Sequence, residues 1–237
     1  MAPTLVLLHG FTHTGRSWDP VIAALGERYT AIAPDIRAHG AASTKEPVSL
    51  EAVIDDVAES GGDAFTLAGY SMGGRLALHA ALALPNRVER LVLIGASPGI
   101  ADPAQRRARR DADERLADEI DRMRIEEFAL RWASNPLLAG QPAAVHEDRL
   151  RNSPAGLARA LRALGTGALP SLWGRLSELE MPVVLLVGEE DEKFRKIAEE
   201  MAASITNAEV VVVPSAGHAA HLEAPEGVAA AIARAWA

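Results

Sequence analysis

Residues 65–74 read FTLAGYSMGG, and this stretch decides the fold. Residues 65–68 form an apolar run of the length of a buried strand, and a helical pattern follows at residues 71–84. Between them stands Gly69-Tyr70-Ser71-Met72-Gly73, a G-x-S-x-G sequence in a strand, turn and helix context. This context predicts a turn so tight that a Cβ at either glycine would strike neighbouring backbone, with the serine in a strained conformation. The Ser71 hydroxyl would then lie clear of the sheet, at a helix N-terminus that favours negative charge.

Short apolar runs recur along the chain and alternate with helical patterns. The runs are apolar on both faces, which is typical of strands that helices cover on both sides. They lie at residues 5–8, 30–33, 65–68, 91–94, 183–187 and 210–213. The helical patterns lie at residues 18–25, 50–59, 71–84, 193–204 and 227–236. Strand followed by helix, repeated, predicts an α/β fold with a doubly wound sheet of about six strands, mostly or fully parallel.

The segment between the fourth and fifth apolar runs has a different pattern. From residue 98 to about residue 181 no strand-like run occurs, and amphipathic, arginine-rich segments are broken at proline or glycine. Because parallel sheets bind ligands at the carboxyl ends of their strands, such an insertion is expected to form a cap over that edge. We predict one α/β-hydrolase domain, with a core of residues 1–97 and 181–237 and a helical cap of residues 98–180.

Two further residues supply an acid and a base in the chain order Ser, Asp, His that the α/β-hydrolase fold uses. Asp191 follows the fifth apolar run and His218 follows the sixth, so each lies just beyond the carboxyl end of a strand. We predict that Asp191 fixes the tautomer of His218 and that His218 takes the proton of Ser71. Glu189 and Glu190 are rivals for the acid, and the longer turn after the strand favours Asp191.

Backbone N–H groups are the expected donors of an oxyanion hole. The loop after the first strand commonly supplies one N–H, and the residue after the nucleophile supplies the other, which names Phe11 and Met72. His9 is expected to pack beneath its loop rather than to react. Asp35 and Arg37 are expected to hold the loop after the second strand. The other histidines, at positions 13, 39, 79 and 146, are expected to be surface or satisfied core residues.

Composition excludes several classes of protein. The 237 residues carry 32 acidic and 24 basic side chains, and this net charge of −8 argues against a nucleic-acid partner. The chain has no cysteine, no metal-ligand spacing such as H-E-x-x-H and no nucleotide-binding glycine pattern, so we expect neither a metal nor a cofactor. Neither a signal-peptide pattern nor a stretch of the roughly 20 apolar residues that cross a bilayer is present. We expect a cytoplasmic protein without membrane insertion, as a monomer or small homo-oligomer.

Motifs beyond the nucleophile turn resemble those of one family. They are LHGFT at 8–12, GYSMGGR at 69–75, SPGI at 97–100, QR at 105–106 with Arg109, LRN at 150–152, GEEDEKF at 188–194 and AGHAAH at 216–221. Over nearly the whole chain they resemble the 2-succinyl-6-hydroxy-2,4-cyclohexadiene-1-carboxylate synthases of menaquinone biosynthesis. The resemblance implies a carbon–oxygen lyase that eliminates pyruvate from 2-succinyl-5-enolpyruvyl-6-hydroxy-3-cyclohexene-1-carboxylate without adding water.

The resemblance also implies roles for individual residues. The triad acts as a base, and the oxyanion hole holds an enolate-type charge. Arg75, Arg109 and Arg151 would bind the carboxylates of a small-molecule substrate, while Tyr70 and Trp132 would line its pocket. This agrees with the arginine-rich, lysine-free cap, since the guanidinium fork binds carboxylates bidentately. Arg75 also stands in the first turn of a helix, where a cation opposes the helix dipole and needs another reason to be present.

The same triad could support other chemistry. A serine carboxylesterase or carbon–carbon bond hydrolase of this fold would use an acyl-enzyme or an attacking water. Carboxylate-binding arginines separate these hydrolases from the lyase, because an apolar ester gains nothing from buried cations that are costly to desolvate. A third alternative is a binding protein that retains the triad without turnover.

Overall fold

Six parallel strands form a single sheet. The computed structural model describes residues 2–135, 138 and 141–234. The strands are β1 (Thr4–Leu8), β2 (Thr30–Ile32), β3 (Phe65–Tyr70), β4 (Val88–Ile94), β5 (Val183–Gly188) and β6 (Ala208–Val213). They lie in the order β2-β1-β3-β4-β5-β6, and every neighbouring pair is parallel. The prediction of a mostly or fully parallel sheet of about six strands is confirmed, since all six are parallel, and their carboxyl ends meet at one edge.

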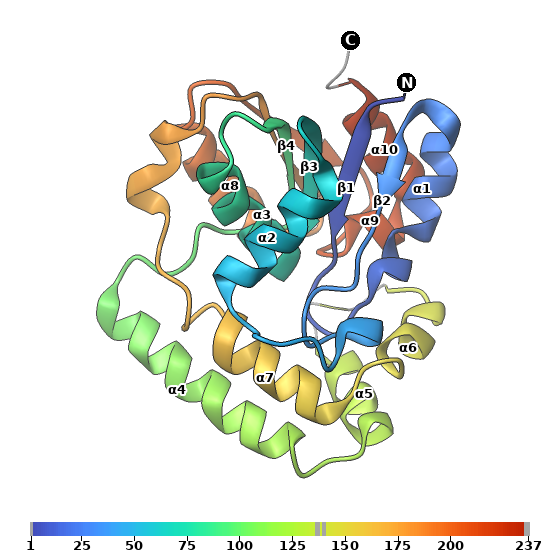
Figure 1. Cartoon of the computed structure of the whole chain (residues 1–237), viewed down its shortest axis with the longest axis vertical. Coiled ribbons are helices and arrows are strands. Elements are labelled where there is room, and N and C mark those ends of the chain that lie inside the picture. Colours follow the sequence, from blue (N-terminus) through green and yellow to red (C-terminus); the bar gives the residue numbers. More distant parts are fainter. Residues whose placement is uncertain (1, 136–137, 139–140, 235–237) are drawn as a thin grey trace.

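Helices cover both faces of this sheet (Figure 1). On one face lie α2 (Leu50–Gly61), α3 (Met72–Ala83) and α8 (Glu192–Ala202). On the other face lie α1 (Asp19–Leu25), α9 (Ala220–Glu223) and α10 (Pro225–Arg234). The central strands alternate between these two cores, so that Leu67 packs toward α3 and Ala68 toward α1 and α10. Burial on both faces explains why these strands are apolar throughout.

Some boundaries differ from those expected. The helical pattern at 18–25 is divided into a 3-10 turn η1 (Gly15–Trp18) and α1, because Pro20 favours the first turn of a new helix. The expected helix at 227–236 begins at Pro225, and its last two residues lie outside the described part of the chain. Two more 3-10 turns, η2 (Gly26–Arg28) and η3 (Gly40–Ala42), lie in the loops before and after β2. The edge strand β6 is less buried than expected, with Val212 42% exposed.

The described residues between β4 and β5 form helices joined by loops and contain no strand. It contains α4 (Pro103–Ile120), α5 (Ile125–Ala133), α6 (Ala144–Arg149), α7 (Pro154–Leu164) and a 3-10 helix η5 (Trp173–Glu178). Figure 1 shows α4 to α7 beyond the carboxyl ends of the strands. The contacts of α4, α5 and α7 form a small apolar core of their own, centred on Phe128 and Leu157. No helix in the described residues has both the length and the apolarity that crossing a membrane requires.

Candidate active site

The turn between β3 and α3 presents Ser71. Its backbone lies at φ 52° and ψ −108°, a conformation that residues with a Cβ rarely adopt. A Cβ on Gly69 would lie 2.4 Å from the Gly73 carbonyl oxygen, and one on Gly73 would lie 2.2 Å from the Leu8 carbonyl oxygen. The two glycines thus allow the start of α3 to approach β1 and β3 closely. Ser71 precedes α3 but its side chain makes no capping hydrogen bond, so the hydroxyl remains available.

The loops after β5 and β6 bring an acid and a base to this serine. His218 Nδ1 lies 2.6 Å from Asp191 Oδ2, and His218 Nε2 lies 3.3 Å from Ser71 Oγ. The other carboxylate oxygen of Asp191 accepts the Phe194 N–H at 3.2 Å, which caps α8 and fixes the orientation of the carboxylate. Both side chains of the Asp191–His218 pair are 3% exposed. The distance from serine to histidine is long for a hydrogen bond, and such contacts often tighten only when substrate binds.

The two glutamates that precede Asp191 lie elsewhere. Glu189 accepts the Ser215 N–H at 2.9 Å through Oε2, which braces the turn before His218. Glu190 is exposed, and its own N–H donates to the Ala216 carbonyl. Of the three candidate acids, the geometry therefore selects Asp191.

The backbone donors expected for an oxyanion hole flank Ser71. Met72 is the first residue of α3, where the N–H has no acceptor within the helix. Phe11 lies in a turn after β1 that the His13 N–H closes by donating to the Gly10 carbonyl at 3.1 Å. His9 is fully buried beneath this turn, where Nε2 accepts the Ile36 N–H and Nδ1 donates to the Gly10 carbonyl, both at 2.9 Å. His9 thus has the structural position expected of it.

Ser71 opens into a cavity of about 430 Å³ between the sheet edge and the helices of the insertion. Its wall combines the reacting groups with aromatic and charged side chains. These include Ser71, His218, Phe11, Met72, Trp132, Trp173, Phe194, Arg75, Arg109, Lys193 and Asp113. Three cations thus face one carboxylate, which favours an anionic ligand. Among the described residues, no group of histidine, aspartate and glutamate side chains could hold a metal ion.

Arg75 is the most deeply buried of these cations. It is 7% exposed, and Nη2 donates to the Leu164 carbonyl at the end of α7 at 3.0 Å. Its Nε has no hydrogen-bond partner within the described structure. Burial, together with the positive charge of Arg109, lowers the pKa of Arg75 to about 10. Arg109 donates from Nε to Asp113 Oδ1 at 2.7 Å, so this pair leaves Arg75 without a carboxylate of its own.

Comparison with known proteins identifies the family. The model of the alpha/beta hydrolase family matches residues 5–231. A protein of Bacillus subtilis (strain 168), provisionally named 2-succinyl-6-hydroxy-2,4-cyclohexadiene-1-carboxylate synthase, is 38% identical over 93% of this chain and 85% of the relative. The chain belongs to the alpha/beta hydrolase family, among these synthases. The synthase of that name from Serratia proteamaculans (strain 568) is 31% identical over 96% of this chain and 91% of its own. The solved structure of MenH from S. aureus is 34% identical, with a TM-score of 0.92 over 99% of this chain and 93% of that chain.

Two residues that the resemblance to the synthases assigns to substrate lie outside the cavity wall. Tyr70 is 2% exposed, and its ring centroid lies 4.2 Å from that of His221 and 5.3 Å from that of His218. As the last residue of β3, Tyr70 has the same side-chain direction as Ala68, toward α1 and α10, so it packs behind the base. Arg151 is exposed in the turn between α6 and α7 and borders a separate pocket of about 300 Å³. Arg75, Arg109 and Trp132 do line the cavity, as expected.

Several side chains in or around the synthase-like site could not be identified from the sequence. Arg149, rather than Arg151, is the buried arginine of its segment, at 4% exposed, and it donates to Gln141. α6 ends at Arg149, so Arg151 stands in the turn that follows, and the sequence does not mark this helix end. Lys193 lines the cavity although the sequence offered it only as part of a motif. Glu223 accepts the N–H groups of Gly217 at 2.6 Å and of Ala219 at 3.1 Å, which holds the chain on both sides of His218.

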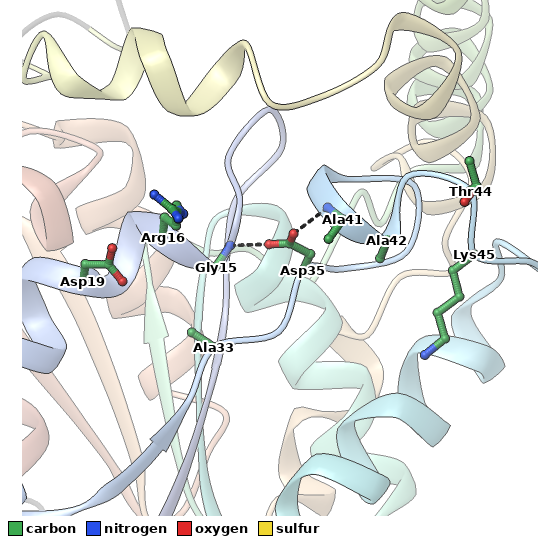
Figure 2. Close-up of a pocket in the computed structure, with 9 residues that line it drawn as sticks. All are labelled: Gly15, Arg16, Asp19, Ala33, Asp35, Ala41, Ala42, Thr44 and Lys45. Atoms are coloured by element: carbon green, nitrogen blue, oxygen red, sulfur yellow. Dashed lines mark hydrogen bonds between the residues drawn. The ribbon is translucent and has the colours of Figure 1, made fainter.

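A more open pocket of about 560 Å³ lies over the loops that follow β1 and β2 (Figure 2). Within it the Asp35 carboxylate accepts the N–H groups of Gly15 at 2.8 Å and Ala41 at 2.7 Å. Arg37 pairs with Asp56 at 2.7 Å nearby. Asp35 thus joins the two loops, and Arg37 ties the loop after β2 to α2, so both hold that loop as expected.

Proposed function

We propose that this protein is a 2-succinyl-6-hydroxy-2,4-cyclohexadiene-1-carboxylate synthase, a lyase that eliminates pyruvate from 2-succinyl-5-enolpyruvyl-6-hydroxy-3-cyclohexene-1-carboxylate. One observation carries the proposal: Ser71 and His218, the latter bound by Asp191, line a single cavity together with three cations and one carboxylate. The names of the relatives that cover most of the chain agree with it.

The proposed reaction uses the triad as a base. His218, oriented by Asp191, takes the proton of Ser71, and the Ser71 oxygen removes a proton from the ring of the substrate. The electrons of that C–H bond form a ring double bond as the C–O bond to the enolpyruvyl group breaks. The departing enolate takes up the proton and becomes pyruvate, so no water is consumed and no acyl-enzyme forms. The N–H groups of Phe11 and Met72 stabilise the negative charge that develops on substrate oxygen.

The cations of the cavity supply substrate recognition in this proposal. Arg75 and Arg109 bind carboxylates of the substrate, and Lys193 adds a third positive charge at the cavity wall. Trp132 provides an apolar surface for the ring. A neutral ester would leave the buried Arg75 without a carboxylate partner, and an unpaired buried charge costs on the order of several kcal/mol. This cost favours the lyase over a carboxylesterase.

Pyruvate release tests the proposal directly. The precursor is generated enzymatically, and pyruvate is measured by coupled reduction to lactate. Wild-type protein should release pyruvate rapidly, while Ser71→Ala should lower the rate by at least about 10³-fold, because the base is removed. Ser204→Ala, an exposed serine after α8, is the matched control and should keep the wild-type rate.

The hydrolase alternative has its own outcome in this test. Pyruvate release no faster than the spontaneous background, together with Ser71-dependent hydrolysis of a p-nitrophenyl ester, would assign a carboxylesterase or carbon–carbon bond hydrolase instead.

We also propose a setting for this activity. The protein acts in the cytoplasm as a monomer or small homo-oligomer, on a small-molecule substrate and without bound cofactor. Residues 1–97 and 181–237 form its core, and residues 98–180 form the cap. The helices between β4 and β5 and their separate apolar core support this division. Size-exclusion chromatography with light scattering would test the oligomeric state.

A further inference from the structure

The turn that presents Phe11 contains a strained residue. Thr12 lies at φ 71°, which is rare for a β-branched residue. It is the third residue of the turn that the His13 N–H closes onto the Gly10 carbonyl, and glycine or asparagine usually stands there when φ is positive. Strain of this kind persists only where surrounding contacts fix the conformation. The contacts of Thr12 therefore identify what holds the turn.

The Thr12 carbonyl accepts a hydrogen bond from the helical segment between β4 and β5. Asn152, in the turn between α6 and α7, donates from Nδ2 to the Thr12 carbonyl at 2.8 Å and to the Arg149 carbonyl at 3.2 Å. Its Oδ1 accepts the Gly40 N–H at 3.1 Å. Asn152 is 5% exposed, so these hydrogen bonds are shielded from water. One side chain thus joins the loops after β1 and β2 to the segment above them.

A second side chain from the same segment holds the loop two residues further on. Asp148 accepts the Thr14 N–H at 2.9 Å and the Thr14 hydroxyl at 2.5 Å. Asp148 is 8% exposed. Asp148 therefore fixes Thr14, and Asn152 fixes Thr12. Together these hydrogen bonds set the backbone conformation of the turn that begins before Phe11.

We propose that Asn152 is a positioning residue that sets the direction of the Phe11 N–H by holding Thr12 at positive φ. The inference rests on the proposed function, in which Phe11 supplies an oxyanion-hole donor. Asn152 does not line the cavity, so it acts through the turn rather than on the substrate. Without its hydrogen bond, Thr12 relaxes to negative φ, and the chain before it, including the Phe11 N–H, rotates away from the developing charge.

Relief of the strain provides a sharp test. Asn152→Ala is made in the wild type and in a Thr12→Gly background, and kcat and KM for pyruvate release are measured. In the wild type, Asn152→Ala should lower kcat by at least about tenfold, since a misaligned donor loses transition-state stabilisation. KM should change less than about threefold, because uniform substrate binding is retained. In the Thr12→Gly background the same change should lower kcat less than about threefold, because glycine adopts positive φ without strain.

A neighbouring residue provides the matched control. Ser153 caps α7 by accepting the Gly156 N–H at 3.1 Å and, within the described part of the chain, its side chain makes no hydrogen bond to the Thr12 turn. Ser153→Ala should lower the melting temperature while leaving kcat unchanged. An equal loss of kcat from Asn152→Ala in both backgrounds, or a loss confined to KM, would overturn the proposal.

A spectroscopic readout separates this proposal from the lyase assignment. The chain has four phenylalanines, so ¹⁵N-phenylalanine labelling gives four amide signals, and Phe11→Leu identifies that of Phe11. Asn152→Ala should shift the Phe11 signal, and Thr12→Gly with Asn152→Ala should return it toward its position in Thr12→Gly alone. An unchanged signal in Asn152→Ala would overturn the proposal. If the wild type released no pyruvate, the lyase function would fail while this signal still decided the role of Asn152.

Discussion

Ser71 lies at φ 52°, and a strained backbone of this kind costs about 1–3 kcal/mol. The β3–α3 turn offers no relaxed alternative, because the backbone around Gly69 and Gly73 leaves no space for a Cβ. The strain directs the hydroxyl away from the start of α3 and toward His218 Nε2, 3.3 Å away. Thr12 and Ser215 also have positive φ, so the loops after β1 and β6 store strain beside the site as well.

The unpaired position of Arg75 leads to a prediction about substrate choice. Arg75→Ala should lower kcat/KM for pyruvate release by about 100-fold, because the carboxylate it binds would be left without its partner. Hydrolysis of a small neutral p-nitrophenyl ester should change less than about threefold. Arg75→Lys, which keeps the charge but loses the guanidinium fork, should fall between the wild type and Arg75→Ala.

The hydrogen bond from Arg75 to the Leu164 carbonyl makes a control necessary. If Arg75→Ala loosened the whole site, both substrates would lose activity equally, and that result would rule out carboxylate binding by Arg75. A melting curve of each variant separates loss of fold from loss of binding.

The positions of Ser71, Asp191 and His218 could be predicted from the sequence because each follows the end of a strand. The parallel sheet then brings the three strand ends to one edge without further information. Arg151 could not be placed in this way, because short helices end according to local capping and packing. The Asn152 side chain faces the Thr12 turn, and its neighbour Arg151 faces solvent.

At the scale of elements, α4 and α7 are joined by an ion-pair network around one arginine. Arg162 on α7 contacts Glu114 at 2.8 Å, Asp118 at 2.6 Å and Asp121 at 2.8 Å, which lie along the second half of α4 and just after it. Hydrogen bonds to these carboxylates raise the pKa of Arg162. Its side chain is 31% exposed, so each ion pair is partly screened by water.

This network predicts a measurable, salt-dependent contribution to stability. Arg162→Ala should lower the free energy of unfolding by about 1 kcal/mol, since a network exceeds an isolated surface pair. The loss should shrink in 1 M NaCl, where the screening length is only about 3 Å. Arg175→Ala, which removes an isolated surface pair with Glu178, is the control and should have a smaller effect. Denaturant titrations at low and high salt measure both, and equal effects would show that the network adds nothing.

The strands were predicted from apolar runs in the sequence. The prediction was correct for strands such as β3 and β5, which are buried on both faces and therefore apolar throughout. The apolar runs placed the first residues of β4 and β6 too late in the chain. β4 starts at Val88 rather than residue 91, because Val88 and Arg90 pair with β3 on either side of the exposed Glu89, where the register shifts. β6 likewise begins at Ala208, and Glu209 points outward. Ladder hydrogen bonds do not depend on side-chain polarity, so the sequence carries little signal at these ends.

The net charge of the whole chain is negative, whereas the charged side chains that line the cavity are mostly positive. The chain carries a net charge of −8, yet the cavity presents three cations and one carboxylate. Recognition of an anionic substrate therefore depends on local placement of arginine and lysine rather than on the overall charge. For this reason the net charge argued against a nucleic-acid partner but did not indicate that the cavity would bind carboxylates.

The whole molecule also contains an unusual number of buried histidines, and these predict how its stability depends on pH. His39 and His221 are both fully buried, and burial lowers the pKa of each from 6.5 to about 3. Between those values the unfolded chain binds protons that the folded chain excludes, so the free energy of unfolding falls as the pH falls below about 6.5. Lowering the pH from 7 to 5 should cost about 2 kcal/mol for each of these histidines.

Urea titrations at pH 5, 6 and 7 measure this slope. The window isolates the histidines, because carboxylates such as Asp56 have a pKa lowered from 3.8, and their contribution is lost only at more acidic pH. His221→Phe removes one titrating group whose two ring nitrogens have no hydrogen-bond partner within the described structure. The variant should therefore lose less stability between pH 7 and pH 5 than the wild type, by about 2 kcal/mol. If the two slopes were the same, His221 would already be protonated in the folded protein or absent from the linkage, and its burial would not control acid sensitivity.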